Sequence, residues 1–241
     1  MAPAPNGFLE HLRSSGYHPR SNEHSNSLAA SIVADLVTHC PAIRERVAAG
    51  RIVYDLNFTI HAGTSDWNVD LVLGEPPMGS SPPAPGQLIV RTRPSTVEIA
   101  IEIKSVMTEH HKAVKNRKRD LEAHHDHVHR YSQRAIAGGV LVINGSNTFR
   151  SPLRSERTTH RNPDDLVRHC LDQLRAVTVR HSVDGAGLDA KCAIVVDMDN
   201  ENLLGTRYLT SKPAPPVGDP VQYDAFIQAV CGQYTGRFAT S

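Results

Sequence analysis

The chain has 241 residues, of which 21% are charged and 39% are apolar, and its formal net charge is +1. These values are ordinary for one soluble globular domain, and the small net charge gives no argument for nucleic-acid binding from overall charge. No apolar run reaches the length of a transmembrane helix, and the first residues lack an export signal, so we expect a cytoplasmic protein with no membrane partner. The scattered cysteines form no CxxC pair and predict reduced thiols: Cys40, Cys170, Cys192 and Cys231.

The first half of the chain has the apolar pattern of helices followed by strands. Helices are expected at residues 8–15 and 25–40, with a further helical turn that reaches Ala49 and stops at Gly50. A loop rich in proline and glycine occupies residues 75–87. The strands expected around it cover residues 51–60, 66–74, 88–92 and 97–106.

The second half begins with a long charged helix over residues 108–137, ended by Gly138 and Gly139. After it we expect a strand at 140–144, an arginine-rich loop to 162, a helix at 163–179, a strand at 191–198, a linker at 213–220 and a helix at 221–233. This order indicates an α/β sandwich with a mixed sheet, formed by a single domain over residues 1–241.

The strand around residues 97–104 alternates strictly, which is the period of a strand with one buried face and one solvent-exposed face. The polar face ends in Glu102 and Lys104, whose Cα atoms lie about 6–7 Å apart in a strand. About thirty residues upstream, Asp70 interrupts the apolar segment Val-Asp-Leu-Val-Leu, where β-propensity disfavours aspartate. Two carboxylates and a lysine at strand ends suit a metal-dependent phosphodiesterase, because Mg²⁺ takes oxygen ligands and a lysine can hold the attacking water.

These motifs, Asp70 in NVDLVLG and then IEIK ending in Glu102 and Lys104, resemble the PD-(D/E)XK nuclease superfamily, which includes many restriction endonucleases. Val69 stands where many members have proline. The resemblance implies a restriction endonuclease-like fold with its core at about residues 25–144, completed by an extension over residues 145–241. It also implies that Asp70, Glu102 and the Ile103 carbonyl bind Mg²⁺, for which Mn²⁺ can substitute, and that Lys104 serves the water.

The resemblance suggests further members of the site and competitors for it. Glu23 is the nearest candidate for the glutamate that many members carry on their first helix. His110 is a candidate for contact with the scissile phosphate, and Gln133 a candidate for reaching back toward the metal. Asp66 competes with Asp70 as the first acid, but Gly63-Thr64-Ser65-Asp66 reads more simply as a turn.

Two basic segments are candidates for binding a nucleic-acid backbone. In the long helix, Lys112, Lys115 and Arg119 share one face by their spacing, and Arg117 lies beside them. The later loop carries four arginines in a flexible stretch: Arg150, Arg154, Arg157 and Arg161. Arginine forks suit phosphates and guanine edges. A solvated helix face and an ordinary polar loop remain the alternatives.

Six histidines lie within residues 109–134, among them His125 and His129 at a spacing of four and His124 and His127 at a spacing of three. Either pair can share a metal ion, but the segment lacks an HExxH motif and a cysteine pair, so the usual signature of a zinc site is missing.

The sequence therefore predicts a Mg²⁺-dependent endodeoxyribonuclease of restriction or phage-defence type. Its expected partner is double-stranded DNA, which the family cuts to leave a 5′-phosphate, and a homodimer is expected if both strands are cut at a symmetric site. Two alternatives remain open. One is a nuclease-like fold that only binds nucleic acid or a partner, and the other is a metal hydrolase centred on the histidines between His124 and His129.

Overall fold

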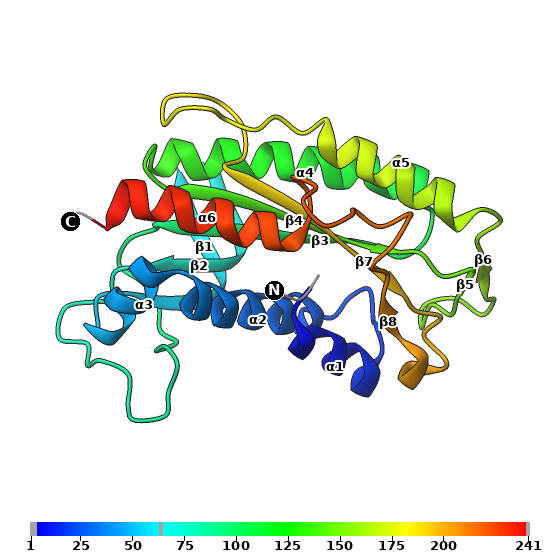
Figure 1. Ribbon diagram of the computed structural model, residues 1–241, viewed down its shortest axis with the longest axis horizontal. Helices are drawn as coiled ribbons and strands as arrows, with labels where there is room; N and C mark the ends of the chain where they lie inside the picture. The colour runs from blue at the N-terminus through cyan, green and yellow to red at the C-terminus, as the bar shows by residue number, and fades with distance from the viewer. Residues whose placement is uncertain (1–3, 63–64, 240–241) are drawn as a thin grey trace.

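A mixed β-sheet forms the middle layer of the protein, and helices cover both of its faces (Figure 1). The computed structural model describes residues 4–62 and 65–239, and within these ranges six strands form the main sheet, in the order β1-β2-β3-β4-β7-β8. The strands of this sheet are β1 (Val53–Ala62), β2 (Ser65–Gly74), β3 (Ile99–Val106), β4 (Ile136–Asn144), β7 (Ala190–Asp197) and β8 (Arg207–Tyr208). A small separate hairpin consists of β5 (Thr148–Phe149) and β6 (Thr158–Thr159).

The strand directions change in the middle of the sheet. β1, β2 and β3 form an antiparallel meander, while β3, β4 and β7 run parallel to one another, and β8 closes the edge in the antiparallel direction. A parallel step needs a crossover connection, which a helix supplies between β3 and β4. The structure thus confirms the α/β sandwich with a mixed sheet.

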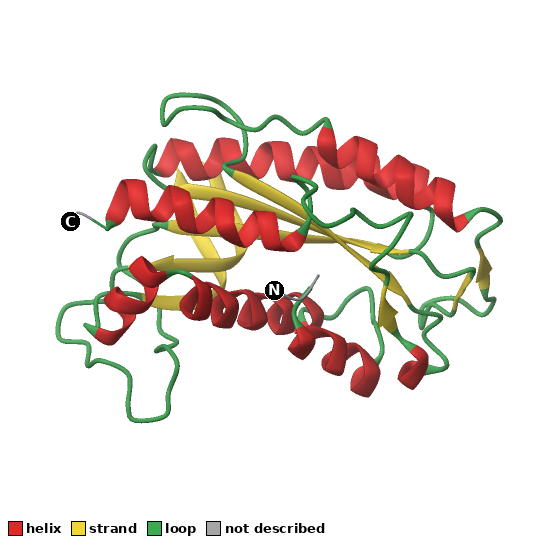
Figure 2. Ribbon diagram, viewed as in Figure 1, coloured by secondary structure: helices red, strands yellow, loops and turns green. Residues whose placement is uncertain are grey.

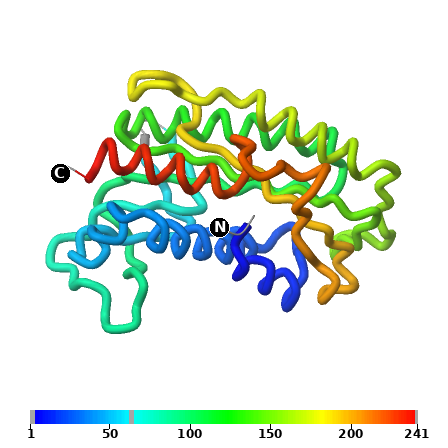
Figure 3. The backbone as a smooth tube through the Cα atoms, viewed as in Figure 1, coloured from blue at the N-terminus to red at the C-terminus, as the bar shows by residue number. Residues whose placement is uncertain are grey.

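The helices divide between the two faces, as Figure 2 shows. The helices of the structure are α1 (Asn6–Ser15), α2 (Glu23–His39), α3 (Pro41–Ala48), α4 (His110–Tyr131), α5 (Pro163–Arg175) and α6 (Tyr223–Phe238), with a 3-10 turn, η1 (Leu203–Gly205). One apolar core unites α1, α2, α3 and α6 with one face of the sheet, and a second core lies under α4 and α5. Segments from the two ends of the chain, α2 and α6, pack side by side on the first face (Figure 3).

The long helix ends earlier than expected, and the glycine pair belongs to a strand. α4 ends at Tyr131, Ser132 adopts an extended conformation, and β4 includes both Gly138 and Gly139. A Cβ atom on Gly139 would lie 2.8 Å from a methyl group of Leu188, so these glycines allow close packing inside the sheet. The prediction that they end the helix was therefore wrong.

The solvent-exposed face predicted for residues 97–104 was also wrong. Ala100 is fully buried and Glu102 is only 2% exposed, because α4 folds back over this face of β3. The alternation fails at its start as well, since Glu98 accepts hydrogen bonds from Arg46 and Tyr234 on the opposite side of the sheet. Residues 88–92, expected as a strand, make a single bridge between Arg91 and Tyr54.

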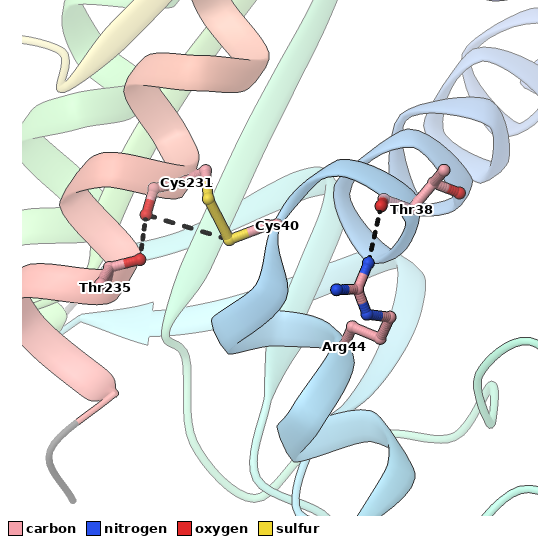
Figure 4. Close-up of a disulfide and its surroundings, with 5 residues drawn as sticks. All are labelled: Thr38, Cys40, Arg44, Cys231 and Thr235. Atoms are coloured by element: carbon pink, nitrogen blue, oxygen red, sulfur yellow. Dashed lines mark hydrogen bonds between the residues drawn. A yellow bond between two sulfur atoms is a disulfide. The ribbon is translucent and has the colours of Figure 1, made fainter.

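Two of the four cysteines are bonded to each other, contrary to the predicted set of reduced thiols. Cys40, between α2 and α3, forms a disulfide with Cys231 in α6, and their Cα atoms are 5.4 Å apart (Figure 4). The two cysteines are 191 residues apart in the chain, so no rule based on cysteine spacing predicts the pair. Cys170 and Cys192 are free and buried, as expected for structural thiols.

Among the described residues, no helix is both long enough and apolar enough to cross a bilayer.

Loss of the disulfide should destabilise the fold, because the bond restricts the unfolded chain over a very long loop. We expect the double variant Cys40→Ser/Cys231→Ser to lose about 2–5 kcal/mol of unfolding free energy in urea titrations. Adding a reductant should lower the stability of the wild type and leave that of the variant unchanged. If denatured wild-type protein already shows four titratable thiols before reduction, the bond is absent.

Candidate active site

The site begins where β2 and β3 separate. Their antiparallel ladder ends at the pair Leu71 and Ile101. One residue further, Asp70 and Glu102 would be the next pair, but the two backbones no longer pair there. The two predicted acids therefore lie on neighbouring strands at the point where the sheet opens.

The neighbouring strand β1 is distorted at the same level. Asn57, which stands opposite Asp70 in the register, has a φ of 54° and is not paired, although pairing continues on both sides. Leu56 belongs to the core under α2, whereas Phe58 belongs to the core under α4. The two faces of the strand therefore exchange sides of the sheet at Asn57. Asparagine tolerates this left-handed conformation better than most residues, and its side chain donates to Asn26 of α2 at 2.9 Å.

Asp70 is held by the backbone of β3. The Ile103 N–H donates to its Oδ2 at 2.7 Å, and Ser25, near the start of α2, also interacts with this carboxylate. Burial raises the pKa of Asp70, while the Ile103 N–H and the charge of Lys104 oppose the rise. The carboxylate is thus fixed toward the strand that carries the other two predicted residues.

Glu102 lies deeper in the protein than Asp70. It is 2% exposed, and its Oε1 forms an ion pair with Lys104. Burial and then the charge of Asp70 raise its pKa to about 7, against the opposing effect of Lys104. Its Oε2 is buried and has no hydrogen-bond partner among the described residues. An unpartnered buried carboxylate oxygen is costly, and it is a natural ligand for a cation.

His124 faces this unpartnered oxygen. Its Nδ1 lies 3.9 Å from Glu102 Oε2, and its Nε2 donates to the Ala100 carbonyl at 3.2 Å. Burial lowers the pKa of His124 to about 3, so the ring is neutral and Nδ1 carries a lone pair. This contact was not predicted, although the spacing of Arg117, Asp120 and His124 places all three on one face of α4.

A third acid lies near the pair. Asp120 of α4 accepts from Arg117 Nη1 at 2.9 Å, and its charge raises the pKa of both Glu102 and Lys104. Burial opposes the charge of Lys104, but the three carboxylates outweigh burial and raise its pKa, so the amine stays protonated. Its side chain remains 24% exposed and can reach a substrate.

The donor set fits a hard divalent cation. The carboxylates of Asp70 and Glu102 and the carbonyl of Ile103 are oxygen donors, and Mg²⁺ commonly combines one or two carboxylates with several waters. In the described part of the chain, no group of three or more His, Cys, Asp or Glu side chains is arranged to hold a metal ion. A cation here would therefore depend on these two carboxylates, the carbonyl and water.

Three predicted accessory residues make contacts with groups outside this set. Glu23 is exposed and acts electrostatically on His11 and His24. His110 is buried and donates to the Asn144 carbonyl at 2.7 Å, so it fixes the start of α4. Gln133 is exposed beyond the far end of α4, where its carbonyl accepts from an arginine.

Asp66, the competitor for the first acid, lies in β2 and forms an exposed pair with His61 at 2.7 Å. The predicted turn also included Gly63 and Thr64, which lie outside the described residues.

Three of the predicted basic residues of α4 face solvent, and one faces the acids of the site. Lys112, Lys115 and Arg119 are exposed, as their predicted common face requires. Arg117 instead turns toward the acids through Asp120, and its charge also reaches Tyr17, which hydrogen-bonds Ser105.

The arginine-rich loop lies beside the start of α4. Arg154 donates to Glu109 at 3.0 Å, and Arg157 pairs with Glu201. Arg150 donates to the carbonyl of Ser155. Three of the four arginines of this loop thus already have partners within the chain.

Comparisons of the chain with protein-family models, with curated proteins and with solved structures find no match. The resemblance to PD-(D/E)XK nucleases therefore remains a prediction that rests on the residues themselves.

In the metal-free protein, Glu102→Gln should increase the free energy of unfolding, and the increase should be largest at alkaline pH. The folded-state pKa of about 7 lies above the ordinary value, so the buried charge opposes folding above pH 7, and this cost disappears as the pH falls toward about 4.5. In urea titrations we expect a gain of up to about 3 kcal/mol near pH 8, shrinking toward zero below about pH 5. The exposed control Glu156→Gln should show no such pH dependence, and a variant less stable than wild type near pH 8 would contradict the assignment.

Proposed function

We propose that the protein is a Mg²⁺-dependent DNA endonuclease of restriction endonuclease-like fold. The observation that carries the proposal is the convergence of Asp70, Glu102 and Lys104 where β2 and β3 separate, with one buried carboxylate oxygen that has no partner among the described residues. The order α2, β1 to β3, α4 and β4 is also the order expected for the PD-(D/E)XK core. The reaction class is hydrolysis of a phosphodiester bond.

Each residue of the site has a distinct role in this proposal. Asp70 and Glu102, with the Ile103 carbonyl, would hold the cation, which when bound supplies a Lewis acid and a more acidic water. Lys104, charged and partly exposed, would orient the attacking water and stabilise the negative charge that develops on the phosphate. In the protein without metal, Lys104 offsets part of the repulsion between the two acids.

The exposed basic groups provide the binding surface for the DNA backbone. Lys112, Lys115 and Arg119 project from α4 on the side away from Asp120 and His124, so they would contact phosphates other than the one that is cut. The pairs of Arg154 and Arg157 with glutamates are between exposed side chains, and such pairs contribute little to stability. These arginines can therefore exchange a carboxylate for a phosphate at small cost, with the geometry that guanidinium groups favour.

Loss of either predicted catalytic group should abolish cutting of plasmid DNA. We expect Asp70→Asn and Lys104→Met to reduce the Mg²⁺-dependent rate by at least about 100-fold, because the first removes a ligand charge for the cation and the second removes a charge that acts at the reacting phosphate. Gel assays with Mg²⁺ or EDTA measure the rate. The matched control is Asp66→Asn, which removes an exposed acid of the same strand and should cut normally.

The alternatives give different results in the same assays. DNA binding without any metal-dependent cutting by the wild type would contradict the enzyme and favour a binding module. Cutting that survives both substitutions but is lost in His125→Ala would move the chemistry to the histidines.

The exposed face of α4 should contribute to DNA affinity through phosphate contacts. In an Asp70→Asn background, the triple variant Lys112→Ala/Lys115→Ala/Arg119→Ala should make the dependence of log K on log salt shallower by about 3 units. Fluorescence anisotropy with a duplex between roughly 50 and 200 mM salt measures this slope. Arg168→Ala, which removes an exposed arginine of α5, is the control. An unchanged slope in the triple variant would exclude this face.

A further inference from the structure

A polar cavity of about 460 Å³ lies at the C-terminal end of α4, away from the acids of the proposed active site. α4 contributes His125, Asp126, His129 and Arg130 to its walls. Gln133 and the loop over residues 184–186 complete the lining. The proposed nuclease uses none of these residues.

The two histidines of this cavity lie one helical turn apart on the same face of α4. Their ring centroids are 6.1 Å apart. Two imidazoles that bind one tetrahedral ion through bonds of about 2.1 Å place their centroids roughly 5–5.5 Å apart. The observed spacing of His125 and His129 is slightly larger, so a small rotation of the two side chains would bring the rings to that distance.

A carboxylate already engages one nitrogen of each ring. His129 Nε2 lies 3.3 Å from Asp189 Oδ2, and His125 Nδ1 lies 3.1 Å from Asp126 Oδ1. Metal-binding histidines usually have such a carboxylate on the nitrogen that does not bind the ion, because it fixes the ring and makes the other nitrogen a better ligand. Both rings have this arrangement.

Asp189 is a rigid support for His129. It also accepts hydrogen bonds from Arg180 at 2.8 Å, from the Ala137 N–H at 2.7 Å and from Arg237. Burial opposes its charge, but these donors and His129 lower the pKa of Asp189 to about 2. The carboxylate is therefore ionised and immobile behind the histidine.

The other ring nitrogens remain available. Among the described residues, no hydrogen bond engages His125 Nε2 or His129 Nδ1, and both rings line the cavity. The carboxylates of Asp126 and Asp184 offset the positive charge of Arg130 in the same walls.

We propose that His125 and His129 form a binding site for a borderline transition-metal ion of the Zn²⁺ class, distinct from the nuclease centre. Nitrogen ligands favour Zn²⁺, Co²⁺ or Ni²⁺ over Mg²⁺. The chain supplies two nitrogen ligands, and waters complete the coordination, because no third His, Cys, Asp or Glu of the described residues is positioned to join them. The ion would link two successive turns of α4 and stabilise its C-terminal end.

Zn²⁺ titration calorimetry of the full chain, after treatment with EDTA, tests the site, with Co²⁺ absorption as a second probe. We expect wild type to bind Zn²⁺ and to gain thermal stability from it, as binding to the folded state requires. His125→Gln and His129→Gln should each lose this binding and the Co²⁺ band. His125→Gln keeps the support of Asp189 intact, so it reports on the ligand even if His129→Gln folds poorly.

Two control variants separate this site from Zn²⁺ binding elsewhere on the protein. His127→Gln removes a histidine of the same helix that stacks on Trp67 outside the cavity, and it should bind Zn²⁺ normally. Asp70→Asn should also keep the site, because the nuclease centre is separate. Zn²⁺ binding that is unchanged in His125→Gln and His129→Gln, or lost equally in His127→Gln or Asp70→Asn, would overturn the proposal.

Discussion

The hydrogen bond from the Ile103 N–H to the carboxylate of Asp70 is the contact on which the site depends. It forms where β2 leaves β3, and it replaces the ladder hydrogen bonds that the separating strands no longer make. Because this bond turns Asp70 toward β3, two carboxylates meet in one opening instead of pointing away along separate strands. The distortion at Asn57 and its bond to Asn26 fix the opening from the other side.

The buried acids of the site lower the stability of the fold. Glu102 is buried beside Asp70, and an ionised carboxylate in such a place costs several kcal/mol unless a cation is near. Lys104 provides one positive charge on one oxygen, and the other oxygen faces the lone pair of His124. The positive charge at the site is thus too small to balance the negative charge of its carboxylates. A divalent cation binds strongly under this condition.

Two buried carboxylates of the frame around the site are paired with cationic side chains. Glu98 binds Arg46 and Tyr234 on the α6 side of the sheet, and Asp189 binds Arg180, Arg237 of α6 and His129 of α4. These clusters, with the disulfide, connect α6 and the loops to the sheet. A rigid frame surrounds the opening between β2 and β3, where the carboxylates lack a balancing positive charge. This is the arrangement expected of a preorganised site.

Much of the site was predictable from the sequence because its signal is local. An aspartate inside an apolar strand and an alternating strand that ends in ExK identify Asp70, Glu102 and Lys104 without any tertiary information. The contacts of His124 and Ser25 depend on how helices pack over the sheet, and the hydrophobic periodicity of the sequence does not reveal this packing. The disulfide and the role of Gly138 and Gly139 were missed for the same reason, since their partners lie far away in the sequence.

The claim that Asp70 and Glu102 together hold a divalent cation is tested most directly by titrating Mn²⁺, a paramagnetic substitute for Mg²⁺, and following the free ion by electron paramagnetic resonance. No DNA is needed, so binding is separated from cleavage. The account predicts that wild type removes Mn²⁺ from solution, that Asp70→Asn and Glu102→Gln do not, and that His125→Gln behaves as wild type. Equal Mn²⁺ binding by the wild type and both acid variants would contradict it.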